Sequence, residues 1–171
     1  EKVISVMYKP FNRPDEMSFL IHPFLIKEYN NRWFLQGWLP ETDKYINLGL
    51  DRIISFSIVD GVSDKSKRNK LIALQKNIVG ISFSEEEKPS IIHLRFNDEQ
   101  APYIITKPIH YSQKLIKSTD NGILISIELV INFELEQLIL GYGERVKVIK
   151  PKSLVRHIEN RLKTAAENYS K

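Results

Sequence analysis

The chain contains no cysteine, no long apolar run and no strong excess of charge of one sign. The absence of cysteine excludes disulfide frameworks, thiolate metal sites and thiol nucleophiles, and it agrees with a reducing compartment. No apolar run approaches the roughly 20 residues that span a bilayer, and the N-terminus lacks the pattern of a secretory signal. We therefore expect a soluble, cytoplasmic protein with no membrane partner. Because the sequence begins at Glu1 rather than Met, we expect it to be a piece of a longer protein.

Net charge and composition narrow the class of protein only slightly. A formal charge of +4 and a pI near 9.2 are mildly basic, so total charge alone does not identify a polyanionic partner. Of the 171 residues 42% are hydrophobic, which is enough for one sizeable domain or two small ones.

Signs of catalysis are also scarce. The four histidines lie far apart in sequence and show no metal-ligand spacing, so we predict no metal site and no cofactor. Glu85-Glu86-Glu87 is typical of a solvated acidic loop, because adjacent carboxylates do not converge on one point. Gly141-Tyr142-Gly143 follows a predicted helix instead of preceding one, which excludes a phosphate-binding loop. No nucleophile with a paired base is visible, and we expect that the protein is not an enzyme.

Residues 1–62 read as five short strands separated by turns, a pattern that predicts a small SH3-like or Sm-like β-barrel. Asn30-Asn31 predicts a tight hairpin turn, because asparagine tolerates positive φ. Residues 63–78 are predicted to be a linker ending in a short helix, with Asp64 as its N-cap. Val79–Phe83 is predicted to be a further strand that could join the barrel.

Residues 79–171 change to alternating elements, so the fold class is α+β. The order β-α-β-β-α-β predicts a ferredoxin-like domain with an additional C-terminal helix. Within it, Asp120-Asn121-Gly122 indicates a hairpin, Asn132 is a predicted N-cap and Gly141 a predicted helix end. The apolar stripe of the terminal helix completes this core or forms a dimer seam.

Two motifs at a fixed separation carry a family resemblance. The triplet Trp33-Phe34-Leu35 is followed one hairpin later by Leu50-Asp51-Arg52-Ile53. Together they resemble the signature of the WYL family of bacterial transcriptional regulators. The second region resembles the C-terminal extension of that family at Ala101-Pro102-Tyr103, His110-Tyr111-Ser112-Gln113-Lys114 and Phe133-Glu134-Leu135-Glu136.

The resemblance implies an effector-sensing barrel and an αβ domain for dimerisation and signal relay, so we expect a homodimer. It also implies that operator DNA is bound by an N-terminal helix-turn-helix that this chain does not include. Two departures weaken or re-specify a ligand pocket built on arginines. Phe34 stands where the family name has tyrosine, and Ile46 and Gly49 stand where relatives often have arginine.

The predicted binding surface lies on one strand. Alternation puts Trp33 and Leu35 on one face, and a cation, two rings and an amide on the other. Basic groups interleaved with stacking surfaces suit a nucleotide or single-stranded nucleic acid. The same residues can instead be structural, with Trp38 in the core and Arg52 paired to Asp51. The predicted ligand-binding residues are His22, Lys27, Arg32, Phe34, Gln36, Trp38 and Arg52.

Two further interpretations stay open. The basic residues of 65–70 and 150–163 either touch nucleic acid or form a solvated face. The whole chain can also be a protein–protein oligomerisation platform without a small ligand.

Overall fold

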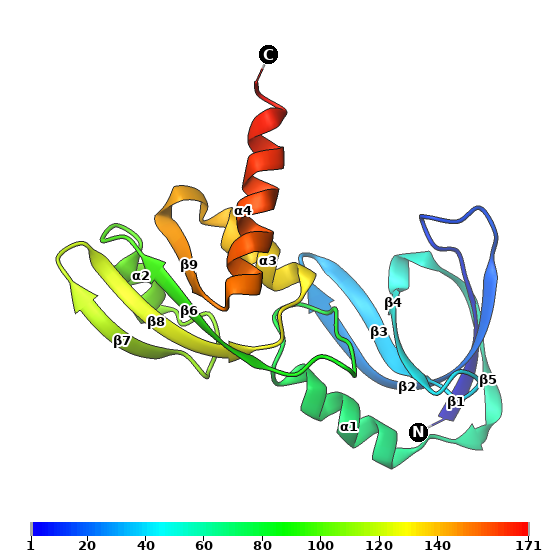
Figure 1. Ribbon diagram of the computed structural model, residues 1–171. Coiled ribbons are helices and arrows are strands. Elements are labelled where there is room, and N and C mark those ends of the chain that lie inside the picture. Colours follow the sequence, from blue (N-terminus) through cyan, green and yellow to red (C-terminus); the bar gives the residue numbers. More distant parts are fainter. Residues whose placement is uncertain (1, 171) are drawn as a thin grey trace. The chain divides into compact units, whose positions relative to one another are not determined.

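The computed structural model describes residues 2–170, and the chain divides into two compact units, residues 1–76 and 77–171. The described residues form a mixed α+β structure with two antiparallel sheets and four α-helices (Figure 1). None of these helices is long and apolar enough to cross a membrane.

The first unit is built on five strands, which curve around a shared interior (Figure 1). The sheet order is β4-β3-β2-β1-β5, so β4 and β5 are the edge strands. Asn30 and Asn31 turn β2 into β3 with φ of 49° and 61°, which confirms the predicted tight turn. The core contains Val6, Tyr8, Ile21, Leu35 and Leu48. The elements are β1 (Lys2–Tyr8), β2 (Met17–Tyr29), β3 (Arg32–Leu39), β4 (Lys44–Gly49), the 3-10 helix η1 (Leu50–Arg52) and β5 (Ile53–Val62).

Helix α1 (Lys65–Gln75) belongs to the first unit and packs against β3. Asp64 caps it as predicted, because its Oδ1 accepts hydrogen bonds from the backbone N–H groups of Ser66 and Lys67. The side chain of Leu71 is fully buried and anchors the helix.

The second unit places its helices on one face of a four-stranded sheet of order β7-β8-β6-β9. Alternate strand residues such as Leu94 and Ile125 share one buried cluster with Ile104 of α2, Leu135 of α3 and Leu154 of α4. The opposite sheet face carries no helix of this unit. The elements are β6 (Ser90–Phe96), α2 (Ala101–Thr106), β7 (Lys114–Thr119), β8 (Gly122–Leu129), α3 (Phe133–Gly141), the 3-10 helix η2 (Gly143–Arg145), β9 (Val146–Lys150) and α4 (Lys152–Glu167).

The segment Val79–Phe83 is not a strand, so that prediction was wrong. Gly80 has φ of 76°, outside the extended region. Side chains at the start of α3 then bind backbone groups that would otherwise pair within a sheet. The side-chain amide of Asn132 donates to the carbonyls of Val79 (2.7 Å) and Ser82 (2.9 Å), while its oxygen caps α3 as predicted. The carboxylate of Glu134 accepts from the Ser82 N–H at 3.2 Å.

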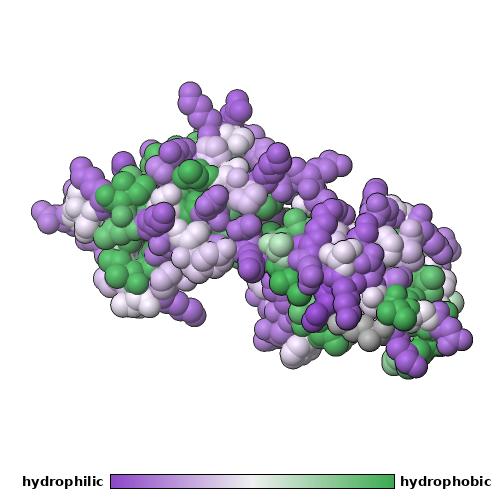
Figure 2. All heavy atoms as spheres, turned by 90° about the horizontal axis from the view of Figure 1, so that it is seen from below, coloured by the Kyte–Doolittle hydropathy of each residue, from purple (hydrophilic) through white to green (hydrophobic). Residues whose placement is uncertain are grey.

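Hydrophobic side chains reach the surface in separate patches between hydrophilic ones (Figure 2). Several exposed apolar side chains of the first unit lie on the edge strand β5, where Phe56 is 68% and Val62 is 82% exposed. Trp33, which alternation places beside Leu35, is 55% exposed because it stands near the start of β3, outside the core cluster.

Candidate ligand-binding site

A hollow of about 460 Å³ opens between η1 and the loop that joins β1 to β2. The loop contributes Lys9, Phe11 and Arg13, and η1 contributes Asp51 and Arg52. Arg32, the first residue of β3, reaches the same place through its contacts with Phe11 and Asp51. We call these six residues the arginine pocket: Lys9, Phe11, Arg13, Arg32, Asp51 and Arg52.

The two guanidinium groups of Arg32 and Arg52 are held by one ring and one carboxylate. Their Cζ atoms lie 5.8 Å and 4.8 Å from the centre of the Phe11 ring, within cation–π range. Arg52 also lies 5.5 Å from the ring centre of Tyr8. Each guanidinium approaches a different oxygen of Asp51 at 3.7 Å, beyond hydrogen-bonding distance. The guanidinium groups are therefore oriented, with donors left for a ligand.

Positive charge predominates in the arginine pocket. Four cationic side chains face a single carboxylate, and the Arg32 side chain is 55% exposed. Phe11 is 72% exposed and presents an uncovered ring. A planar guanidinium binds phosphate or carboxylate through paired hydrogen bonds, and an exposed ring stacks on a base. The arrangement is suited to an anion that carries a flat, apolar group.

Gly49 explains how Arg52 fits into the arginine pocket. A Cβ built on Gly49 would collide with the guanidinium of Arg52 and lie 2.6 Å from Oδ1 of Asp51. The ion pair of Arg52 and Asp51 therefore occupies the space that a side chain at position 49 would fill.

The face of β3 that carries Arg32 is covered further along the strand, so the seven predicted residues do not form one open surface. Phe34 is 7% exposed and Gln36 is fully buried, although both were predicted to face a ligand. Helix α1 packs on β3, and Lys27 of β2 donates a 2.7 Å hydrogen bond to Gln75 at the end of α1. Alternation gave the two faces of the strand correctly, but not which face a later helix would cover.

Trp38 and His22 help to hold α1 on the sheet. The indole Nε1 of Trp38 donates to Asp43 at 3.0 Å, and the ammonium of Lys67 on α1 binds the same carboxylate and lies 4.6 Å from the Trp38 ring centre. The hydrogen bond from Lys67, followed by that from Trp38, holds the pKa of Asp43 below its ordinary value. The His22 ring meets the edge of Trp38 at 5.1 Å, and its Nδ1 accepts the N–H of Asp64 at 3.2 Å.

The structure thus separates the predicted residues into two groups. Arg32 and Arg52 come together in the arginine pocket, and His22, Lys27, Phe34, Gln36 and Trp38 lie against α1 or beneath it. Lys9, Phe11 and Arg13 were not among the ligand-binding residues predicted from the sequence. The signal was present in Lys9-Pro10-Phe11-Asn12-Arg13, which alternates cations with a ring. Within residues 2–170 no group of three or more histidine, aspartate or glutamate side chains is placed to hold a metal ion.

Each of the two units matches a known protein-family domain. The WYL domain matches residues 1–58, and the WCX domain matches residues 89–166. The chain belongs to the WYL-domain proteins. The WYL match includes both signature motifs, and the WCX match contains the three segments that resembled the family's C-terminal extension. The first unit therefore contains a WYL domain and the second a WCX domain.

Two solved structures resemble nearly the whole chain. A CRISPR Cas-related protein shares 11% sequence identity at a TM-score of 0.58, which shows a common fold; the match covers 99% of this chain and 48% of that one. Proteasome accessory factor B/C (PafBC) of Arthrobacter aurescens shares 15% identity at a TM-score of 0.42, with 99% of this chain and 25% of that one covered. The chain thus spans about a quarter to a half of these structures. The comparison with curated proteins found no match.

Proposed function

We propose that the WYL domain binds an anionic effector in the arginine pocket, and that the chain is the effector-sensing and dimerisation region of a bacterial transcriptional regulator. The effector class is a nucleotide or a short single-stranded nucleic acid. One observation carries the proposal: Arg32, Arg52 and the exposed Phe11 ring are gathered at a hollow with a single carboxylate.

The chemistry of the arginine pocket supports this effector class. Phosphate oxygens would take the guanidinium donors and displace the loose contacts with Asp51, while a base would stack on Phe11 for about 1–3 kcal/mol. The predicted residues that lie against α1 or beneath it then have a different role. Trp38, His22 and Lys27 fix α1, and Phe34 and Gln36 are buried in the same region.

The finer architecture belongs to the same proposal. We interpret the first sheet as an Sm-like barrel and the second unit as a ferredoxin-like domain with an added helix, on the basis of strand orders β4-β3-β2-β1-β5 and β7-β8-β6-β9. The regulator would act in the cytoplasm as a homodimer without catalytic activity. It would reach operator DNA through a helix-turn-helix elsewhere in the longer protein. Effector binding regulates only if the two states of the dimer differ in effector affinity.

Fluorescence anisotropy with labelled nucleotides and single-stranded oligonucleotides, at two salt concentrations, tests the effector site. The Arg32→Ala, Arg52→Ala double variant should lose binding at least tenfold, since each lost charge-assisted contact contributes about 1.5–3 kcal/mol. The Lys152→Ala, Arg156→Ala double variant removes two exposed cations of the WCX domain and is the control for net charge. Equal binding by both variants, at unchanged melting temperature, would remove the arginine pocket from the site.

A second candidate function is an oligomerisation platform with no small ligand. The observation that favours it is the edge strand β5, where Ile54, Phe56, Ile58 and Val62 are all more than half exposed. An exposed apolar edge strand is a template for pairing with another chain. Sedimentation velocity distinguishes the two functions: a stable dimer that Phe56→Lys dissociates, together with no thermal shift from any nucleotide, supports the platform.

A further inference from the structure

The open face of the WCX sheet carries a set of lysines that two irregularities in the sheet bring together. On β7 the register shifts between Leu115 and Lys117, so Lys114 pairs with Ser126 and Lys117 with Leu124. On β9 the pairing with β6 shifts between Val148 and Lys150. In a regular strand, residues three apart point to opposite faces. Each bulge inserts one residue and turns both lysines of its strand to the same face.

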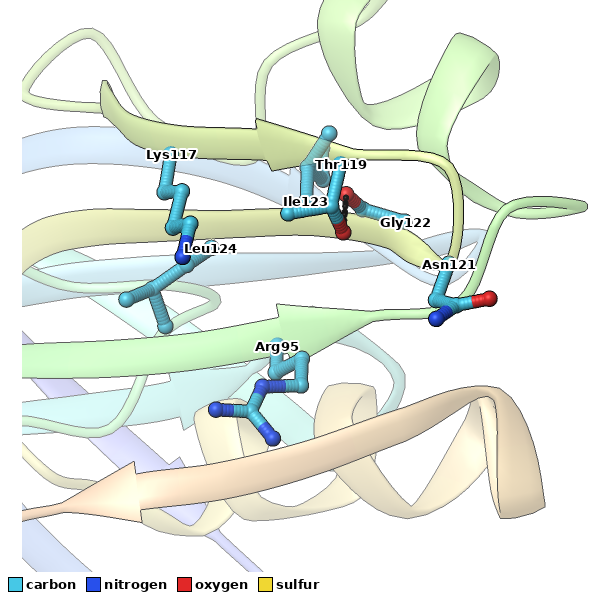
Figure 3. Close-up of a pocket in the computed structure, with 7 residues that line it drawn as sticks. All are labelled: Arg95, Lys117, Thr119, Asn121, Gly122, Ile123 and Leu124. Carbon is cyan, nitrogen blue, oxygen red and sulfur yellow. Dashed lines mark hydrogen bonds between the residues drawn. The ribbon is translucent and has the colours of Figure 1, made fainter.

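The cross-strand pairing extends these lysines into two rows. In the first row Lys117 lies opposite Leu124, Leu124 opposite Arg95, and Arg95 opposite Lys147. In the second row Lys114, Ser126, His93 and Lys150 are paired in the same way. Figure 3 shows the Lys117, Leu124 and Arg95 side chains on three neighbouring strands, beside a hollow of about 220 Å³.

The five strong cations of this face are free to bind an anion. Arg95, Lys114, Lys117, Lys147 and Lys150 are exposed, and within residues 2–170 none of them forms an ion pair with a carboxylate. His93 is half-buried, and burial together with Lys150 lowers its pKa, so it adds no charge at neutral pH. The acid on this face is Glu128, at one end of the sheet opposite Ile91.

We propose that this face, the WCX lysine face, binds the phosphate backbone of double-stranded DNA without reading its sequence. Two lysine columns stand on the edge strands β7 and β9. Three strand spacings separate them, or about 14 Å, close to the roughly 12 Å width of the DNA major groove. The columns are therefore spaced to contact the two backbones that border that groove. The two rows carry no phenylalanine, tyrosine or tryptophan, and their one imidazole, His93, is half-buried, so the face has few of the stacking platforms on which single-stranded binding depends.

Anisotropy of the whole 171-residue chain with a labelled duplex of arbitrary sequence, titrated over a series of salt concentrations, tests the proposal. If all five cations contact phosphates, log K against log salt should have a slope of about −4.5. In the variant with all four lysines changed to glutamine, the slope should fall to about −1 and affinity should drop at least tenfold in about 0.1 M salt. The four substitutions are Lys114→Gln, Lys117→Gln, Lys147→Gln and Lys150→Gln.

A second quadruple variant controls for net charge. It removes four exposed cations of the second unit that lie outside the lysine face and should bind duplex DNA nearly as well as the unmodified chain. Equal weakening in both variants or a slope near zero in the unmodified chain would overturn the proposal. Tighter binding of a single strand than of the duplex by the Arg32→Ala, Arg52→Ala variant, which lacks the arginine pocket, would also overturn it. Arg32→Ala with Arg52→Ala should leave duplex binding by this face unchanged. Failure of the lysine-face proposal can therefore be distinguished from failure of the arginine-pocket proposal. The control substitutions are Lys88→Gln, Lys107→Gln, Lys152→Gln and Arg156→Gln.

Discussion

Replacing Gly49 by alanine tests whether the space beside η1 is what places Arg52 in the arginine pocket. Gly49 has φ of −64° and ψ of 127°, an extended conformation that alanine adopts without strain. The only cost is steric, because the new Cβ would collide with the Arg52 guanidinium and the Asp51 carboxylate. Arg52 must then leave Tyr8, Phe11 and Asp51.

The expected magnitudes separate stability from binding. Two cation–π contacts at about 0.5–1 kcal/mol each and a partly exposed ion pair at about 0–1 kcal/mol give a loss of roughly 1–3 kcal/mol. The reduced entropy of the unfolded chain returns about 0.4–1 kcal/mol. The free energy of unfolding should therefore fall by no more than about 2.6 kcal/mol. Effector affinity should fall about tenfold or more, since a charge-assisted hydrogen bond to the ligand is lost.

Urea denaturation and anisotropy with the tightest-binding nucleotide or oligonucleotide measure the two effects. Gly141→Ala is the matched control, because a Cβ there meets nothing within 4 Å and the residue ends a helix. We expect Gly141→Ala to be stabilising by a few tenths to 1 kcal/mol, with unchanged binding. If Gly49→Ala binds its ligand as tightly as the unmodified chain does, Arg52 is not held in the pocket by this space.

Three further predictions concern other contacts. Lys67→Gln should return the pKa of Asp43 toward its ordinary value, which NMR titration of the Asp43 side chain can follow. Because that pKa is lowered in the folded state, the contact with Lys67 stabilises the protein at pH values above the ordinary pKa of aspartate. This stabilisation is lost as the pH falls. Asn132→Ala removes a helix cap and two bonds to loop carbonyls and should lower the free energy of unfolding by about 2–3 kcal/mol in urea. Lys150→Gln should raise the pKa of His93, by NMR, but leave it below the ordinary value, because burial is the larger cause.

The features that the sequence predicted well are those decided by near neighbours. The positive φ at Asn30 and Asn31 and the caps at Asp64 and Asn132 depend on one side chain and the backbone beside it. The strand expected at Val79–Phe83 failed because a partner more than fifty residues away, Asn132, binds its backbone.

The candidate site shows the same division. Alternation placed Phe34 and Trp38 on one side of β3, but a helix that begins 27 residues after Trp38 covers that side. Similarly, no local rule says that Arg52 would fold back over Gly49 to meet Phe11. The lysine pairs of β7 and β9 were hidden for a related reason, because a bulge cannot be read from strand periodicity.

The contacts between α1 and β3 affect the residue at which the WYL domain can be cut from the rest of the chain. The family match ends at residue 58, yet helix α1, which packs against β3, continues to Gln75. A WYL domain excised at residue 58 would lack this helix, so the part of β3 on which it packs would meet water, and we expect the excised domain to aggregate. Expressed with residues up to 76, the same domain should stay monodisperse. Across related sequences, replacement of the tryptophan at position 38 should be accompanied by loss of the lysine at position 67, since each leaves the other without its partner.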